Sequence, residues 1–242
     1  MLLTINQGNT RTKAMIVGTD TQEHYVTATD ASVQHYRHWL SMLPRPRRVL
    51  LSSVVPNAAA ALCQAAEQLL GVRVEQIEAR TDLGIRFTTV DYHQLGADLF
   101  VNAVASHHCY GGNLLNVDLG SASTFCVIKD GLYLGTSIVP GMELSIRAMI
   151  SGTALLKEFT LTKMERVIND NTIACLQSGI YFGYFELVRG MIQRVQAEHG
   201  PLTVVLTGGI GSFLHEELAP YVHHFRPHLT LDGLRLIAEL IS

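Results

Sequence analysis

Asn116–Thr124 reads NVDLGSAST, and this stretch decides the fold because it repeats a pattern found near the start of the chain. Shifted back by 112 positions, its last eight residues fall on Ile5–Thr12, INQGNTRT, so that Gly120 matches Gly8. In both copies an apolar, strand-forming segment runs through a small polar turn into a second such segment. The repeat therefore predicts two strand-turn-strand units of the same kind.

The polar turns of the two copies suit the binding of phosphate groups. A glycine turn rich in hydroxyl and amide side chains exposes backbone N–H groups to phosphate oxygens, and a neighbouring carboxylate can hold the accompanying metal ion. The second copy has this carboxylate in Asp118, whereas the first copy has the amide Asn6 at the matching position. The repeat thus predicts a two-lobed phosphotransferase in which one lobe lacks its carboxylate.

Composition limits the class of protein. The chain has 242 residues, 48% of them hydrophobic and 16% charged, which is enough for two globular domains. A net charge of −3 argues against a nucleic-acid partner, whose phosphates require a basic face. The four cysteines form no CxxC pair, so neither a disulfide framework nor a zinc knuckle is expected. With no signal-peptide pattern and no membrane-spanning apolar run, we expect a cytoplasmic protein with no membrane partner.

Strand and helix patterns alternate along the chain and predict an α/β protein. Gly111–Gly112–Asn113 is the expected hinge, which gives an N-terminal lobe of residues 1–112 and a C-terminal lobe of residues 113–242. The helices are expected at 31–42, 58–70, 99–108 and 142–150, from 172 onward, and at 232–241. Two glycines of the long helix, Gly179 and Gly183, are expected to allow a close approach of another helix.

Asp98 stands at the start of the helix predicted at 99–108, and two roles are open for it. Aspartate is among the commonest N-cap residues, where its carboxylate accepts backbone N–H groups. It can equally be a carboxylate that points into a cleft and serves the chemistry.

Eight blocks of the sequence occur in the order and spacing of a known family. They are Ile5–Lys13, Ser52–Pro56, Leu95–Asp98, Val117–Thr124, residues 133–135 with 138–141, residues 171–172 with 177–181, Thr207–Gly209 and Leu229–Leu234. In these blocks the chain resembles type III pantothenate kinases over nearly its whole length. The resemblance implies the fold of the actin-like ATPase and sugar-kinase superfamily, two related ribonuclease H-like α/β lobes around a nucleotide cleft.

The resemblance also implies the reaction and its components. Members transfer the γ-phosphoryl group of ATP to pantothenate, the first step of coenzyme A synthesis, and are usually homodimers. ATP and Mg²⁺ are the implied cofactors, with K⁺ or NH₄⁺ as a monovalent cation. Pantothenate or a related small alcohol is the implied substrate.

The site residues are carried over position by position. The residues implied to bind the nucleotide are Gly8, Asn9, Thr10, Lys13, Gly120, Ser121, Ala122, Ser123 and Thr124 in two phosphate loops, and Thr207, Gly208 and Gly209 in the adenosine pocket. Those implied to hold pantothenate are Gly96, Ala97 and Thr172. Asn6 and Asp118 are implied to face the metal ion. Asp98 resembles the general base that takes the proton of the attacking hydroxyl group, which favours the cleft role for it.

Four positions depart from the family pattern. Asn6 replaces an aspartate, Leu99 replaces an arginine that clamps substrate oxygens, and Cys126 replaces a carboxylate linked to the monovalent cation. Thr89 aligns with a tyrosine of the pantothenate pocket. These changes leave three hypotheses: a pantothenate kinase, a catalytically impaired or inactive paralogue with a regulatory or nucleotide-sensing role, and a kinase of another small alcohol.

Overall fold

The computed structural model describes the whole chain except residues 19–20, 89–91, 154–155 and 157 and the side chain of residue 93. Its internal contacts divide the chain into two compact units. Unit 1 contains Met1–Gly112, Lys129–Leu134 and His228–Ser242, and unit 2 contains Asn113–Ile128 and Gly135–Pro227. Each unit combines β-strands with α-helices, so the predicted α/β class is confirmed.

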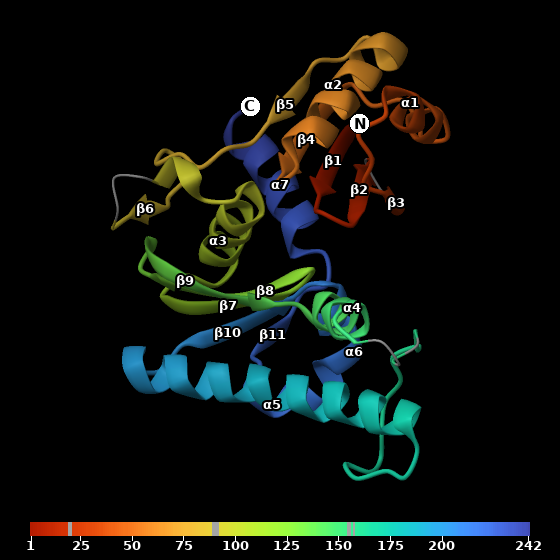
Figure 1. Ribbon diagram of the computed structural model, residues 1–242. Coiled ribbons are helices and arrows are strands. Elements are labelled where there is room, and N and C mark those ends of the chain that lie inside the picture. The colour runs from red at the N-terminus through yellow and green to blue at the C-terminus, as the bar shows by residue number, and fades with distance from the viewer. Residues whose placement is uncertain (19–20, 89–91, 154–155, 157) are drawn as a thin grey trace. The chain divides into compact units, whose positions relative to one another are not determined.

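Unit 1 is built on a five-stranded sheet with the order β3-β2-β1-β4-β5 (Figure 1). Its strands are β1 (Leu2–Gln7), β2 (Arg11–Val17), β3 (Gln22–Ala28), β4 (Arg48–Ser53) and β5 (Val74–Gln76). The first three strands are antiparallel, and β4 and β5 run parallel to β1. The first half of the predicted repeat is therefore the hairpin of β1 and β2.

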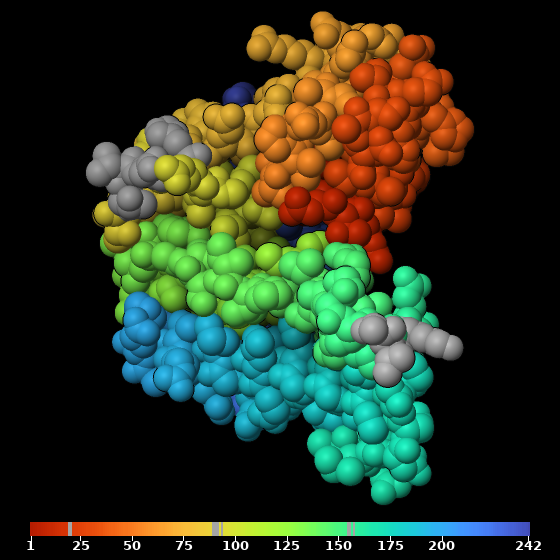
Figure 2. Space-filling view, viewed as in Figure 1, coloured from red at the N-terminus to blue at the C-terminus, as the bar shows by residue number. Residues whose placement is uncertain are grey.

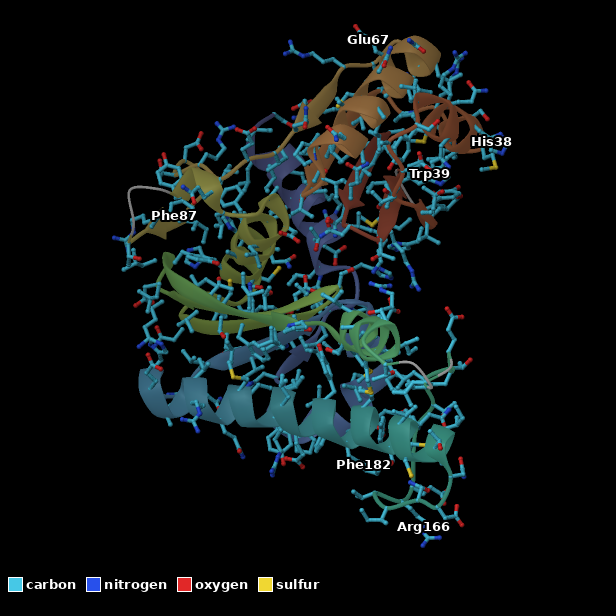
Figure 3. All side chains as sticks on the ribbon, in the orientation of Figure 1. His38, Trp39, Glu67, Phe87, Arg166 and Phe182 are labelled. Carbon is cyan, nitrogen blue, oxygen red and sulfur yellow. The ribbon has the colours of Figure 1, made fainter. Side chains whose placement is uncertain are left out.

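One face of this sheet forms the hydrophobic core of unit 1 with helices α1 (Val33–Ser41) and α2 (Pro56–Leu70). Strand alternation puts Leu3 and Ile5 on this face, where both are fully buried. Figure 3 shows Trp39 directed from α1 into this core, whereas the adjacent His38 points outward. Helical spacing on α1 thus separates a buried stripe from an exposed one.

The other face of the sheet is covered by α7 (Leu229–Leu240), which contacts β1, β2 and β4 and packs along α3 (Ala97–Tyr110). Residues 228–242 therefore lie in unit 1, although the sequence analysis placed them in the C-terminal lobe. The reason is the apolar stripe of α7, which includes the buried Leu234 and Ile237. Arg48 Nη1 donates a hydrogen bond of 2.8 Å to Ala238 O and ties the end of α7 to β4.

The second sheet repeats the strand order of the first. Its order is β11-β10-β7-β8-β9-β6, from β7 (Asn113–Leu119), β8 (Ala122–Lys129), β9 (Leu132–Pro140), β10 (Thr203–Thr207), β11 (His224–Phe225) and β6 (Arg86–Phe87). The series β9-β8-β7-β10-β11 matches β3-β2-β1-β4-β5, which confirms the two strand-turn-strand units. The short β6 pairs with the first residues of β9, and these paired residues belong to unit 1.

The helices of unit 2 are α4 (Met142–Ser151), α5 (Thr172–His199) and α6 (Gly209–Leu218). Asn171 caps α5 by accepting the N–H of Ala174 at 3.0 Å. In Figure 2 the segment that precedes α5 protrudes from unit 2, and it carries the exposed Ile168. The expected close approach at Gly179 and Gly183 is not found, because a Cβ at either position would meet no described atom within 4 Å.

Short 3₁₀ turns at Tyr92–Gln94 and Ala219–Tyr221 complete the described elements. Within the described part of the chain, no helix combines the length and apolar character required to cross a membrane.

The contact between α7 and α3 yields a stability prediction. A Cβ at Gly233 would lie 2.7 Å from Val101 Cγ1 and 2.9 Å from Val101 O, so Gly233→Ala forces the two helices apart. We expect a loss of about 1–3 kcal/mol in the free energy of unfolding, measured by urea denaturation. The matched control is Gly190→Ala on α5, where a Cβ meets nothing within 4 Å and a gain of about 0.5–1 kcal/mol is expected. Equal effects of the two changes would contradict this packing.

Candidate phosphate loops and active-site carboxylates

The expected first phosphate loop, Gly8–Thr10, is the turn between β1 and β2. Gly8 N donates to Arg11 O at 3.1 Å and closes the turn. Thr29, which follows β3, binds the loop twice: its N–H donates to Thr10 O at 3.1 Å, and its hydroxyl group donates to Gly8 O at 2.7 Å. The loop is therefore fixed from outside the hairpin, and Asn9 stays exposed at its tip.

A buried polar cluster lies directly behind this loop, at the end of the apolar sheet face. Three neighbouring strands each place a polar residue there after two buried apolar ones. The three series are Leu3, Ile5, Gln7 on β1; Ile16, Ala14, Thr12 on β2; and Val49, Leu51, Ser53 on β4. Gln7 and Thr12 are fully buried. Buried polar groups must be hydrogen-bonded to be tolerated, and these groups are.

Tyr36 of α1 is the centre of the cluster. Its hydroxyl oxygen accepts from Gln7 Nε2 at 2.8 Å and from Asp30 N at 3.1 Å, and it contacts Thr12 Oγ1 at 3.2 Å. Thr12 Oγ1 in turn lies 3.1 Å from Thr29 Oγ1. Because the only hydroxyl proton of Thr29 goes to Gly8 O, Thr12 must donate to Thr29 and Tyr36 must donate to Thr12.

Gln7 extends the cluster to β4, since its Oε1 accepts from Ser53 Oγ at 2.6 Å. The hydroxyl oxygen of Ser53 accepts in turn from Val55 N at 3.1 Å. One continuous chain of hydrogen bonds thus runs from the end of β4 through Tyr36 to the carbonyl group of Gly8. The last of these hydrogen bonds, from Thr29 to Gly8 O, holds the loop in its orientation.

The expected second phosphate loop follows β7 in unit 2. Gly120 N donates to Ala122 O at 3.2 Å, and Ser121 O accepts from Gly141 N at 3.0 Å. Gly141 must be a glycine, because a Cβ there would overlap the carbonyl oxygen of Gly120. Ser123 is buried and hydrogen-bonded to Tyr184 of α5. This loop is therefore held by the residues that follow β9 and by α5.

Asp118 lies beside the end of β10. Its partner in the parallel pairing of β7 and β10 is the buried Thr207. The next residue, Gly208, has φ of 93°, and a Cβ there would lie 2.6 Å from Asp118 Oδ1 and 2.5 Å from Leu119 O. Gly209 then begins α6. Thr207, Gly208 and Gly209 thus form a turn between a strand and a helix next to the carboxylate, which is where α/β sheets bind phosphate ligands.

The charge of Asp118 also acts on the hydroxyl group of Tyr184 on α5. Burial raises the pKa of its hydroxyl group, the hydrogen bond with Ser123 lowers it, and the charge of Asp118 raises it again. The hydroxyl group therefore stays protonated at neutral pH and remains a partner for the second loop.

Asp98 does not cap α3. The N-cap position is Gly96, Asp98 lies in the first turn, and its Oδ1 accepts the N–H of Leu99 at 2.8 Å. Burial raises the pKa of this carboxyl group, although the hydrogen bond from Leu99 works in the opposite direction. A Cβ at Gly96 would lie 2.8 Å from Asp98 Oδ1, so the glycine leaves room for the carboxylate. Ala97 is buried behind it.

The remaining expected site residues are spread over both units. Asn6 and Lys13 face each other across the first hairpin in unit 1. Thr124 is buried in β8, and Thr172 is the exposed first residue of α5 in unit 2. Asp98 and Asp118 belong to different units. Thr89 lies outside the described residues.

Two of the departures from the family pattern have a clear structural setting. Cys126 is buried in β8, with its Sγ 2.9 Å from Thr136 Oγ1, so it packs as a small side chain and offers no carboxylate oxygen to a cation. Leu99 is half-buried in the first turn of α3, directly after Asp98. Among the described residues no group of three His, Cys, Asp or Glu side chains is arranged to hold a metal ion.

The sequence analysis missed the cluster around Tyr36. Strand alternation places Gln7 on the same face as Leu3 and Ile5, so a polar residue on a core face was the available signal. Tyr36, its partner on α1, could not be identified from periodicity, because it occupies an ordinary core position of the helix.

The Tyr36 cluster yields a second prediction. Tyr36→Phe removes one hydroxyl group and leaves the Gln7 amide group and the Asp30 N–H without that acceptor. We expect the free energy of unfolding to fall by about 1–3 kcal/mol in chemical denaturation. The control is Tyr25→Phe, since the Tyr25 hydroxyl group donates to the exposed carboxylate of Glu23 and its loss should cost less than about 0.5 kcal/mol. A neutral Tyr36→Phe would show that the cluster contributes nothing to the fold.

Comparison with known proteins agrees with this geometry. A family model described as type III pantothenate kinase matches residues 2–194. The type III pantothenate kinase of Phenylobacterium zucineum (strain HLK1) is 36% identical over 247 residues, which cover 97% of this chain and 96% of that protein.

Two solved structures share the fold at low sequence identity. A candidate 2-dehydro-3-deoxygalactonokinase from Sinorhizobium meliloti has a TM-score of 0.62 at 13% identity, with 100% of this chain and 97% of that chain covered. The inorganic polyphosphate/ATP-glucomannokinase from Arthrobacter sp. strain KM has a TM-score of 0.52 at 15% identity, with 100% and 99% covered. With the duplicated sheet order, these similarities confirm the predicted fold of two actin-like lobes.

Proposed function

The chain belongs to the type III pantothenate kinase family, and we propose that it transfers the γ-phosphoryl group of ATP to the hydroxyl group of pantothenate, the first step of coenzyme A biosynthesis. The observation that carries the proposal is Asp98, a carboxylate held in the first turn of α3 with Gly96 clearing space beside it. A structural cap would sit one or two residues earlier and would not require that space.

The nucleotide is proposed to bind through the two phosphate loops. The backbone N–H groups of Gly8–Thr10 and Gly120–Ser121 would hold phosphate oxygens, with Lys13 adding charge, and Thr207–Gly209 would line the adenosine pocket. Asp118 and Asn6 are the proposed residues on the metal side, since carboxylate and amide oxygens are both possible ligands of Mg²⁺, which is usually held by one or two protein oxygens together with substrate phosphates. Bound there, the ion would neutralise charge on the transferred group.

Asp98 is proposed to act as the general base. Its ionised carboxylate would accept the proton of the pantothenate hydroxyl group while that oxygen attacks the γ-phosphorus in line. Burial raises the pKa of this carboxyl group toward the working pH, and this strengthens it as a base. Gly96, Ala97 and Thr172 are the proposed pantothenate contacts. A homodimer in the cytoplasm, stimulated by K⁺ or NH₄⁺, completes the proposal.

A second function is favoured by Leu99 and Cys126. Leu99 puts an isobutyl group next to the proposed base, where the family pattern has a guanidinium group. Loss of one cation that stabilises the transition state commonly costs about 10³–10⁵ in rate. The alternative is therefore a catalytically impaired or inactive paralogue that binds the nucleotide and acts as a regulatory or nucleotide-sensing protein.

Asp98→Asn tests the kinase hypothesis. We expect the unchanged chain to release ADP in a coupled assay only when pantothenate, Mg²⁺ and K⁺ or NH₄⁺ are present, and we expect Asp98→Asn to be at least about 100-fold slower. The rate of the unchanged enzyme should rise with pH through the raised pKa of Asp98, because the base must be ionised. Pantothenate-dependent turnover that is equal in both proteins would overturn the role of Asp98.

Thermal denaturation of the same variant checks that the loss is chemical. The pKa of Asp98 is raised above its ordinary value of 3.8, so its ionised form disfavours the folded state. Asp98→Asn should therefore raise the melting temperature at pH 7, and this gain should shrink as the pH falls toward 3.8. Unfolding of the variant at pH 7 would mean that its inactivity says nothing about catalysis.

Restoring the missing groups separates the two functions. In an impaired kinase, Asn6→Asp combined with Leu99→Arg should raise pantothenate-dependent turnover, because both the metal-side charge and the clamp return. If ATP binds in calorimetry but turnover stays absent in the double variant, the nucleotide-sensing function is favoured. If ATP does not bind, both functions fail.

A further inference from the structure

A pocket of about 260 Å³ lies between the β2–β3 ribbon and the start of α7, within unit 1. Four of the side chains that line it are cations or become cations on protonation: Arg11, Lys13, His24 and His228. They come from three separate places in the chain, which are β2, β3 and the N-cap position of α7. The pocket is therefore produced by the fold and is not a run of basic sequence.

The two imidazole rings are stacked. The ring centroids of His24 and His228 lie 4.0 Å apart, with an angle of 25° between the ring planes. This arrangement brings together two groups that repel each other when both are protonated. Burial lowers the pKa of His228, and the charges of His24 and Lys13 lower it further, while Asp232 on α7 acts in the opposite direction.

Lys13 adds a permanent charge to the same pocket. Its cross-strand partner in the first hairpin is Asn6, a neutral amide. None of the ion pairs found in the described part of the chain includes Lys13. Clustered cations raise the local potential and attract anions.

The start of α7 strengthens the same potential. His228 is the N-cap residue, and its side chain makes no capping hydrogen bond to the first turn. The N-terminus of a helix carries a partial positive charge from its backbone N–H groups. The side chain of His228 at this helix end thus lines the same pocket as those of Lys13 and His24.

We propose that this pocket binds a small multivalent anion, a phosphate group or a phosphate monoester, held by the imidazoles of His24 and His228 and the ammonium group of Lys13. The anion would neutralise the repulsion between the two rings and bind most tightly when they are protonated. Its affinity therefore falls as the pH rises and the positive charge of the pocket is lost. The other charged or titratable groups around the pair are Arg11 on β2, Tyr25 with Glu23 on β3, and Asp232 on α7.

The pocket shares Lys13 with the proposed nucleotide site, whereas His24 and His228 are outside that site. Its position next to the first phosphate loop leaves two sources for the phosphate: the bound nucleotide, through Lys13, or a free phosphate compound that would regulate the protein.

Inorganic phosphate is the probe that tests the proposal. We expect titration of the full chain to shift the imidazole NMR signals of His24 and His228 in a saturable way at pH 6, and more weakly at pH 8. His24→Gln and His228→Gln should each lower the phosphate affinity about tenfold, the loss that a charge-assisted hydrogen bond typically brings. The matched control is His38→Gln on α1, because His38 is exposed and is not among the residues that line the pocket, so this change should leave the affinity unchanged.

Addition of ATP to the phosphate-loaded protein assigns the source. Displacement of phosphate from the two histidines would make the pocket part of nucleotide binding, and simultaneous binding would make it a separate site; both outcomes support an anion pocket. Phosphate binding without any ATP binding would keep this proposal and remove the proposed kinase function. The proposal is overturned if the signals of His24 and His228 shift no more than that of His38, or if both glutamine variants bind phosphate as tightly as the unchanged chain.

Discussion

The parallel pairing of one strand against each hairpin is the constraint on which both glycine loops, Gly8–Thr10 and Gly120–Ser121, depend. In unit 1, β4 pairs with β1 so that Ser52 lies opposite Asn6, and in unit 2, β10 pairs with β7 so that Thr207 lies opposite Asp118. The carboxyl ends of paired parallel strands meet at one edge of the sheet. Each glycine loop is therefore supported by the strand end beside it, and a slip in register would turn the supporting side chains to the other face.

The two units use this register differently. The residue after Ser52 is Ser53, whose hydroxyl group donates a hydrogen bond to Gln7. Gln7 in turn donates to Tyr36 and continues the chain of hydrogen bonds. The residue after Thr207 is Gly208, which clears the space for the Asp118 carboxylate. The same order of strands thus supports two different loops. In unit 1 the loop is held by a chain of hydrogen bonds, and in unit 2 the loop has a carboxylate beside it. The position of Asp118 in the repeat is taken by the amide Asn6 in unit 1.

Much of the fold could be predicted because it depends on patterns of neighbouring residues in the sequence. Apolar runs around Gly8 and Gly120 give the hairpins, and the ordered blocks identify the family. The position of α7 could not be predicted in this way, because its contacts with β1 join residues more than 200 positions apart and its stripe of Leu234 and Ile237 would suit either unit. The role of Tyr36 and the stacking of His24 on His228 are equally non-local, since each depends on a single side chain meeting another element in space.

The most direct test of this account is calorimetric titration of ATP with Mg²⁺ into the unchanged chain and into Gly208→Ala. A methyl group at Gly208 would press on the Asp118 carboxylate, so we expect the affinity for ATP to fall at least about tenfold, a loss of about 1.4 kcal/mol. Gly200→Ala carries the same strain of a positive φ, 81°, with no atom within 4 Å of the new Cβ, and it should bind ATP as the unchanged chain does. Equal ATP affinities in all three proteins would contradict the proposed position of the nucleotide beside Asp118.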